Sequence, residues 1–270
     1  MIFLLQDESE LDIDVKILDE SIRKQRGIHS RTYIDLEGLH QNVETYLKNT
    51  VKTRIVKKGI IPVGSIEFVK EYLRIYGISE LNPIEVPKAL QTKEFLKRDY
   101  SIVSYKEIPK DGNYFIKDVS KLKQFSFSGN MDSLFQNYSD KLNDSHLYQV
   151  SENVEIISEY RCFIHNDKIV CINHYDGDPT IFPDISTLNK MICMYMFDKE
   201  RPRAYSLDIA IIKDRGTAVI EVHPWVSVGL YSYLFGSDLP YCYADGLQYY
   251  LDYNKPIETC EIKFENLDYT

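Results

Sequence analysis

Residues 205–229, YSLDIAIIKDRGTAVIEVHPWVSVG, decide the fold and carry the main candidate site. The stretch predicts two strands, YSLDIAII and TAVIEVH, joined by a short Asp214-Arg215-Gly216 turn. Glycine in such a turn supplies the positive φ that a hairpin connection needs. We therefore expect the two strands to pair with each other as an antiparallel hairpin.

Two carboxylates are predicted to meet across this hairpin. Strand alternation places Ser206, Asp208 and Ala210 on one face, and Glu221 and His223 share a face of the partner strand. Asp208 and Glu221 would repel each other among apolar neighbours unless a cation lies between them. Magnesium is typically held by one or two carboxylates together with substrate phosphate oxygens, so the stretch favours a metal–phosphate site. The alternative is that both acids face solvent on an ordinary edge pair.

The composition is typical of a globular protein. The 270 residues are 44% hydrophobic and 27% charged, which is enough to bury a sizeable core. A net charge of −9 does not favour a protein that coats nucleic acid. We expect no membrane association, because no apolar run reaches the length of a span. The five cysteines show no zinc spacing, and their odd number fits a cytoplasmic protein better than a disulfide framework.

Strand-like and helix-like segments alternate over the first eighty residues, beginning with MIFLLQ and DVKILDESIRKQ. This alternation predicts a small parallel α/β domain. At Gly64-Ser65 either free amides bind an anion or Ser65 caps the helix IEFVKEYLRIYG. Pro83 and Pro87 mark the boundary between a first domain, residues 1–82, and a second, residues 83–270.

The second domain begins with a predicted helix, PKALQTKEFLKRD, and two strands, SIVSYKEIP and NYFIKDV, paired around a turn at residues 110–113. Lys117 ends the apolar run of the second strand. A lysine at that position is suited to neutralising nucleotide phosphates. The alternative is a solvated surface lysine.

Arg161 lies in the strand-like run IISEYRCFI, which begins a predicted hairpin around His165-Asn166-Asp167. A half-buried arginine usually has an anionic partner. Glu159, Asp208 or a bound phosphate would serve, and the residues alone leave all three open. Glu159 would then either partner the metal or orient the arginine.

These candidates form an ordered series that resembles the ATP-grasp superfamily, and most closely its small clade named for one arginine and two lysines. The resemblance covers about residues 80–250 and is carried by the runs IIPVGSIEFV, FIKDVSK, SEYRCFI and IEVHPWVSVGLYSY. It implies an α/β (α+β) architecture in which the small parallel domain is followed by an ATP-grasp fold of two α+β lobes with antiparallel sheets. The nucleotide-binding lobe would span residues 83–152 and the catalytic lobe residues 153–270.

The resemblance also implies roles for the matched positions in the nucleotide-binding lobe. Lys93 and Lys117 correspond to the two phosphate-binding lysines. The backbone of Gln149, Val150, Ser151 and Glu152 corresponds to the hinge that reads adenine, and Glu152 is placed to meet the ribose.

In the catalytic lobe, Arg161 is similar to the arginine that holds the γ-phosphate and the acyl-phosphate. Asp208 and Glu221 correspond to the magnesium ligands. The family usually has Glu-x-Asn where this chain has Glu221-Val222-His223. Because imidazole suits magnesium less well than an amide oxygen does, His223 is either a tolerated ligand, a cause of weaker metal binding, or a residue with another role.

The function that the resemblance implies is an ATP-dependent carboxylate–amine ligase. It would use ATP and Mg²⁺, pass through an acyl-phosphate, and act on a peptide or amino acid. A nucleotide-binding module that acts through a protein partner, and a phosphotransferase on the same scaffold, are the alternatives.

Overall fold

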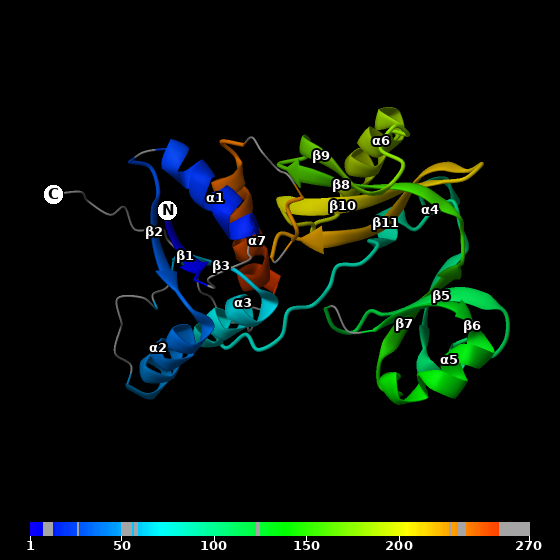
Figure 1. Cartoon of the computed structure of the whole chain (residues 1–270), viewed down its shortest axis with the longest axis horizontal. Coiled ribbons are helices and arrows are strands. Elements are labelled where there is room, and N and C mark those ends of the chain that lie inside the picture. The colour runs from blue at the N-terminus through cyan, green and yellow to red at the C-terminus, as the bar shows by residue number, and fades with distance from the viewer. Residues whose placement is uncertain are drawn as a thin grey trace. The chain divides into compact units, whose positions relative to one another are not determined.

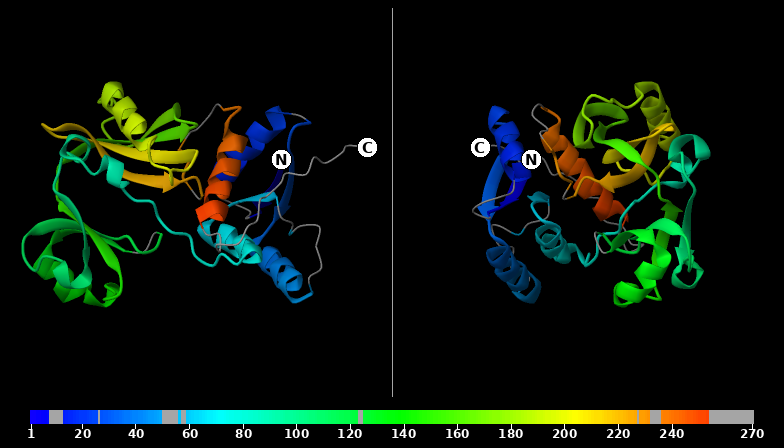
Figure 2. Two further views of the ribbon diagram at one scale, coloured as in Figure 1. Left: turned by 180° about the vertical axis from the view of Figure 1, so that it is seen from behind. Right: turned by 45° about the vertical axis from the view of Figure 1, so that its right-hand side comes forward.

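The computed structural model describes residues 1–7, 13–25, 27–49, 56, 59–122, 125–226, 228–231 and 236–253 (Figures 1 and 2). The chain forms two compact units. The first contains Met1–Glu80, Pro202–Ala204 and the chain from Trp225 onward, and the second contains Leu81–Arg201 and Tyr205–Pro224.

The first unit is built on a three-stranded parallel sheet in the order β2-β1-β3. Parallel neighbours need crossover connections, and helices supply them here. The predicted small parallel α/β unit is therefore confirmed. Its elements are β1 (Ile2–Gln6), α1 (Ile13–Lys24), β2 (Ser30–Ile34), α2 (Leu36–Asn49), β3 (Ile60–Val63), α3 (Ile66–Leu73) and α7 (Leu239–Tyr253).

The C-terminal helix α7 belongs to this first unit, where it packs beside α1 and contacts β3 (Figure 1). The division near residue 80 lies close to the boundary predicted at residue 82. The sequence prediction places residues 83–270 in one domain, whereas the chain returns to the first unit after Pro224. In the first unit α7 contacts α1, a helix that buries Val15, Leu18 and Ile22.

Ser65 is the N-cap of α3. Its Oγ accepts a hydrogen bond from the backbone N–H of Phe68 (3.2 Å), and its own N–H donates to Oε1 of Gln6 (2.6 Å). Of the two alternatives at the Gly64-Ser65 turn, the structure thus shows the cap. Gly77 closes the following turn with φ 76°, as expected for a C-terminal glycine.

Ser65→Ala is expected to lower the free energy of unfolding by about 1 kcal/mol, because the N–H of Phe68 loses its acceptor. Urea denaturation followed by circular dichroism measures the change. Ser65→Asp, which keeps an acceptor oxygen, serves as the matched control and should retain most of the stability. Equal losses in the two variants would contradict the capping role.

The second unit begins with a four-stranded antiparallel sheet in the order β4-β7-β5-β6. Its core contains Ile116, Met131, Leu134, Tyr148 and Val150. The elements are β4 (Tyr100–Ser104), β5 (Asn113–Asp118), β6 (Ser126–Asn130), α5 (Met131–Asn137) and β7 (Leu147–Glu152).

The predicted pairing of the first two of these strands is wrong, because β7 lies between β4 and β5. A 3-10 turn at Tyr105–Glu107, closed by a capping box between Ser104 and Glu107, ends β4. The predicted helix PKALQTKEFLKRD is also shorter than expected. Only α4 (Lys93–Leu96) is an α-helix there. Thr92 is its N-cap, and Lys97, with φ 54°, is its C-cap.

The second sheet of this unit has the order β11-β10-β8-β9. Helix α6 (Ile185–Tyr195) packs on one face, where Leu188 and Met191 join Leu207 and Ile209 in the core. The hairpin turn has the predicted positive φ at Gly216, 82°. The strands are β8 (Ile156–His165), β9 (Lys168–Gly177), β10 (Ala204–Ile212) and β11 (Gly216–Pro224).

None of the described helices has the length and apolar character that crossing a bilayer would require.

Candidate functional site

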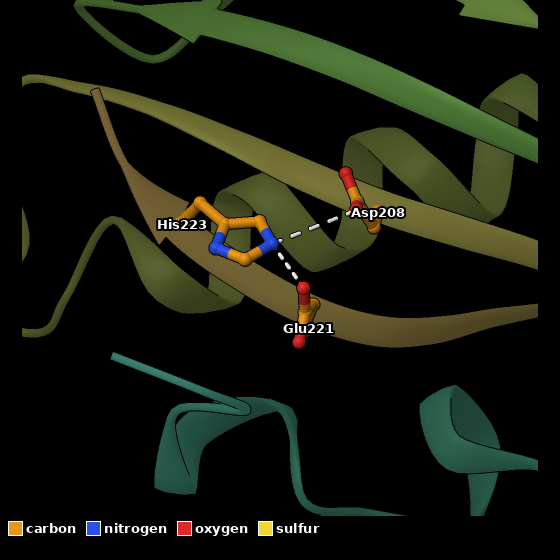
Figure 3. A group of neighbouring side chains, drawn as sticks. All are labelled: Asp208, Glu221 and His223. Carbon is orange, nitrogen blue, oxygen red and sulfur yellow. Dashed lines mark ion pairs between the residues drawn. The ribbon is translucent and has the colours of Figure 1, made fainter. Parts of the chain in front are cut away.

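The β10–β11 hairpin contains the predicted pair of acids, and a β-bulge between Asp208 and Ile209 shifts the register by one residue to bring them together. Asp208 lies directly opposite Glu221, and Ser206 lies opposite His223. Oxygen atoms of the two acids and a ring nitrogen of His223 lie within 4.8 Å of one another (Figure 3). Nε2 of His223 is 3.8 Å from Oδ2 of Asp208 and contacts Oε1 of Glu221. Asp208 is only 3% exposed, so the solvent-facing alternative is wrong.

Arg161 on β8 binds Asp208 on the neighbouring strand β10 through two parallel hydrogen bonds. Nε donates to Oδ1 (2.8 Å) and a terminal nitrogen donates to Oδ2 (2.7 Å). Both side chains are at most one-tenth exposed. Among the three partners left open for Arg161, the structure shows Asp208. A carboxylate has about four lone-pair positions, so Asp208 retains capacity for another ligand.

Lys117 on β5 contacts two carboxylates at once. Its Nζ donates to Oε2 of Glu85 (2.8 Å) and to Oε2 of Glu221. The lysine side chain is 20% exposed, so it is not the solvated surface lysine of the alternative reading. The six residues Glu85, Lys117, Arg161, Asp208, Glu221 and His223 are called the charged cluster below.

The electrostatics of the charged cluster keep Glu221 ionised. Burial alone would raise the pKa of Glu221, but the hydrogen bond and charge of His223, together with Lys117, outweigh it and lower that pKa to about 2. Burial lowers the pKa of Lys117, and the charges of Glu221 and Glu85 more than compensate, so its net pKa is raised. Lys117 therefore stays a cation while Glu221 stays an anion.

Glu159 is bound by a tyrosine rather than by the arginine. The Tyr175 hydroxyl donates to Oε2 of Glu159 (2.5 Å), and the Arg161 guanidinium lies 5.8 Å from the centre of the Tyr175 ring. Burial raises the pKa of Glu159, partly offset by this hydrogen bond. Tyr175 thus links Glu159 to the edge of the charged cluster.

Two buried hydroxyls beside the charged cluster have no hydrogen-bond partner among the described residues: Oγ of Ser206 and Oη of Tyr100. Ser206 is fully buried and lies across the ladder from His223. Tyr100 is close enough for Glu85 and Glu221 to raise the pKa of its hydroxyl, after the larger effect of burial. Buried polar atoms usually find a partner, so these two are available to a bound ligand.

The charged cluster fits a divalent cation. Counted without His223, its three carboxylates and two basic side chains leave one negative charge in excess. Asp208 and Glu221 offer the carboxylate oxygens that magnesium prefers, and an imidazole nitrogen completes a group that manganese also accepts.

The predicted adenine hinge lies on β7. Gln149, Val150 and Ser151 are buried, and their strand pairs with β4 on one side and β5 on the other. Gln149 is the direct cross-strand neighbour of Lys117. The connection from this sheet to β8 follows at residues 153–155, beyond the ladder.

Two of the predicted site residues lie apart from the charged cluster. Glu152 forms a double hydrogen bond with Arg215 of the hairpin turn (2.6 and 2.8 Å) and accepts from the N–H of Asp99. Lys93 is exposed at the start of α4. Within the described ranges its ammonium makes no hydrogen bond or ion pair with any residue of the charged cluster.

Sequence reasoning missed Glu85. It lies between the two boundary prolines, in a segment with neither strand nor helix periodicity, so no pattern marks it. The sequence places Ser206 on the correct face but without a role, because only the tertiary structure shows that its hydroxyl has no partner among the described residues.

The comparison with protein families gives one match. The model, which describes an ATP-grasp domain of family 2 in the clade named for one arginine and two lysines, matches residues 95–234, just over half of the chain. The match includes Lys117, Arg161, Asp208 and Glu221, and it begins two residues after Lys93. No curated protein matches the chain in sequence.

Solved structures with the same fold include three ligases and synthetases at low sequence identity. D-alanine–D-alanine ligase from Bacillus anthracis, complexed with ATP, has a TM-score of 0.55 at 14% identity, over 93% of this chain and 96% of that one. D-cycloserine synthetase DcsG has a TM-score of 0.51 at 12% identity, over 94% and 100%. The ATP-grasp ligase PsnB, complexed with minimal precursor, Mg and ADP, has a TM-score of 0.50 at 11% identity, over 92% and 97%. At these identities the likeness shows the fold alone.

Proposed function

Because this chain belongs to the one-arginine, two-lysine clade of the ATP-grasp family, we propose that it is an ATP-dependent carboxylate–amine ligase. One observation carries the proposal. Asp208, Glu221 and His223 meet on one hairpin. Lys117 contacts Glu221, and Arg161 contacts Asp208. That arrangement can hold a cation against a polyphosphate without any nucleophilic side chain.

Asp208 and Glu221, with His223 beside them, would hold Mg²⁺. When bound, the ion would neutralise phosphate charge. Lys117 and Lys93 would bind phosphate oxygens, and Arg161 would face the transferred γ-phosphate. Residues Gln149–Glu152 would place the adenine, with Glu152 at the ribose.

The proposed reaction requires positioning and charge neutralisation rather than covalent catalysis. A substrate carboxylate oxygen attacks the γ-phosphorus, and the bond to ADP breaks. The amine nitrogen of the second substrate then attacks the acyl carbon, phosphate leaves, and the amine releases a proton. Arg161 suits this sequence because its planar guanidinium binds phosphate oxygens in pairs.

We extend the proposal to peptide or amino-acid substrates in the cytoplasm, where ATP is supplied. PsnB with its precursor and D-alanine–D-alanine ligase support this substrate class by analogy of fold. We expect neither a membrane nor a nucleic acid among the partners.

Calorimetric titration with ATP and Mg²⁺, followed by assays of ADP and phosphate release with panels of carboxylates and amines, tests the function. Substrate-dependent release of both products is expected. Nucleotide binding without turnover across the panels would instead support a binding module that acts through a protein partner. That second function is favoured by His223 in place of asparagine. ADP release with a stable phosphorylated product would indicate a phosphotransferase.

His223→Asn is expected to shift the ratio of apparent Mg²⁺ to Mn²⁺ affinities by roughly tenfold toward Mg²⁺. The reason is that an amide oxygen suits magnesium better than an imidazole nitrogen does. Metal titrations of ADP release measure the ratio. His40→Asn, an exposed histidine of the first unit, is the control. An unchanged ratio would mean that residue 223 does not touch the metal.

A further inference from the structure

Glu85 has an unusual backbone conformation in the segment that joins the two prolines. Its φ is 57°, in the left-handed region that residues other than glycine seldom adopt. The carbonyl of Glu85 accepts a hydrogen bond from the N–H of Val222 (2.8 Å), in an isolated antiparallel bridge to β11. Val222 directly follows Glu221. The strained residue is therefore tied to the strand that carries a proposed metal ligand.

The side chain of Glu85 is directed at a functional lysine. Its Oε2 accepts from Nζ of Lys117 at 2.8 Å, and only 12% of the side chain is exposed. Strain of this kind persists where surrounding contacts over-determine the conformation, and such residues concentrate at functional sites. Here the conformation places a carboxylate on an ammonium that already contacts Glu221.

Lys117 thus has two anionic partners that differ in what else they can bind. Glu221 lies beside Asp208 and His223 and belongs to the proposed metal site. Glu85 contacts the same ammonium but does not belong to that group of three. A cation bound to Glu221 would repel the Lys117 ammonium and compete with it for that carboxylate, and a second anion then keeps the ammonium from being left buried without a partner.

We propose that Glu85 is a positioning residue: it keeps an ion pair with Lys117 when Glu221 binds a divalent cation. This inference rests on the proposed function of the charged cluster. Glu85 lowers the cost of separating Lys117 from Glu221, so it favours metal binding before a nucleotide arrives. Once phosphate oxygens are present they offer Lys117 another anion, and the contribution of Glu85 becomes smaller.

Binding of Mn²⁺, used as a paramagnetic probe and followed by the signal of the free ion, tests the inference without any turnover. Glu85→Gln keeps the shape and backbone of the residue. It is expected to weaken Mn²⁺ binding about tenfold without nucleotide, but by less than about threefold with a non-hydrolysable ATP analogue. Glu200→Gln, an exposed carboxylate of the same unit, should leave Mn²⁺ affinity unchanged. Thermal melts of each variant check that the fold is retained.

A double-mutant cycle with Lys117→Met separates positioning from simple attraction between Glu85 and the metal. Without Lys117 there is no ammonium for Glu85 to hold, so Glu85→Gln should change Mn²⁺ affinity by less than about twofold in the Lys117→Met background. An effect that persists in the Lys117→Met background would overturn the inference, as would unchanged Mn²⁺ affinity in Glu85→Gln itself.

The outcome also distinguishes this inference from the function beneath it. If Mn²⁺ binding is lost in Glu221→Gln but unaffected in Glu85→Gln, the proposed metal site stands and only the role of Glu85 is contradicted. Absence of Mn²⁺ binding in the unsubstituted protein would overturn both.

Discussion

Replacing Glu221 with glutamine is expected to lower the rate of ADP release by about 100-fold or more. The carboxylate contacts Lys117 and His223 and faces Asp208 across the ladder. Its lowered pKa of about 2 keeps it anionic at any pH at which the protein would work. Glutamine has nearly the same shape but brings no negative charge, so cation binding is lost while packing is kept.

Steady-state assays of ADP release at saturating ATP and Mg²⁺ measure the effect. Glu200→Gln makes the same chemical change on an exposed side chain and should retain the full rate. Near-normal ADP release by Glu221→Gln would remove Glu221 from the site and, with it, the proposed position of the metal.

Breaking the Arg161–Asp208 pair is expected to have the largest effect on stability. Either Asp208→Asn or Arg161→Met alone should cost about 3–5 kcal/mol of unfolding free energy, because each leaves a buried charge without its partner. The two parallel hydrogen bonds and the low exposure of both side chains support this magnitude.

The double variant is expected to lose much less than the sum of the two single losses, because no buried charge is then left unpaired. Urea denaturation in the presence of EDTA, followed by circular dichroism, measures all four proteins without a contribution from bound metal. Strictly additive losses would contradict the buried pair.

The hairpin could be predicted from the sequence because its determinants are local. The Asp214-Arg215-Gly216 turn sets which residues pair, and alternation then sets which face each side chain takes. Continued without a break, the register set by the turn would place Asp208 opposite Ile220. A β-bulge between Asp208 and Ile209 shifts the pairing by one residue and brings Asp208 opposite Glu221, and no local rule predicts that bulge. The parallel sheet of the first unit was predictable for a similar reason, since alternating strand and helix patterns allow few topologies.

The order of β4 and β5 was not predictable in the same way. Both strands carry suitable patterns and a turn-forming stretch lies between them, so local rules predict a hairpin. The strand that separates them, β7, arrives some thirty residues later in the chain. Strand β7 takes the position between β4 and β5 because Tyr148 and Val150 are buried there, in a core that exists only once the sheet has formed.

By itself, the sequence determined the family resemblance and the hairpin that carries Asp208 and Glu221, whereas the β-bulge that sets these two residues opposite each other is visible only in the structure. The tertiary structure alone decided which basic side chains contact Asp208 and Glu221. Arg161 reaches Asp208 because β8 lies next to β10, and Lys117 reaches Glu221 although 104 positions separate them. Glu85 joins them through a backbone bridge to β11. The physical reason is that turn and strand preferences act between near neighbours in the chain, whereas charge compensation depends on distances that only the packed sheets establish.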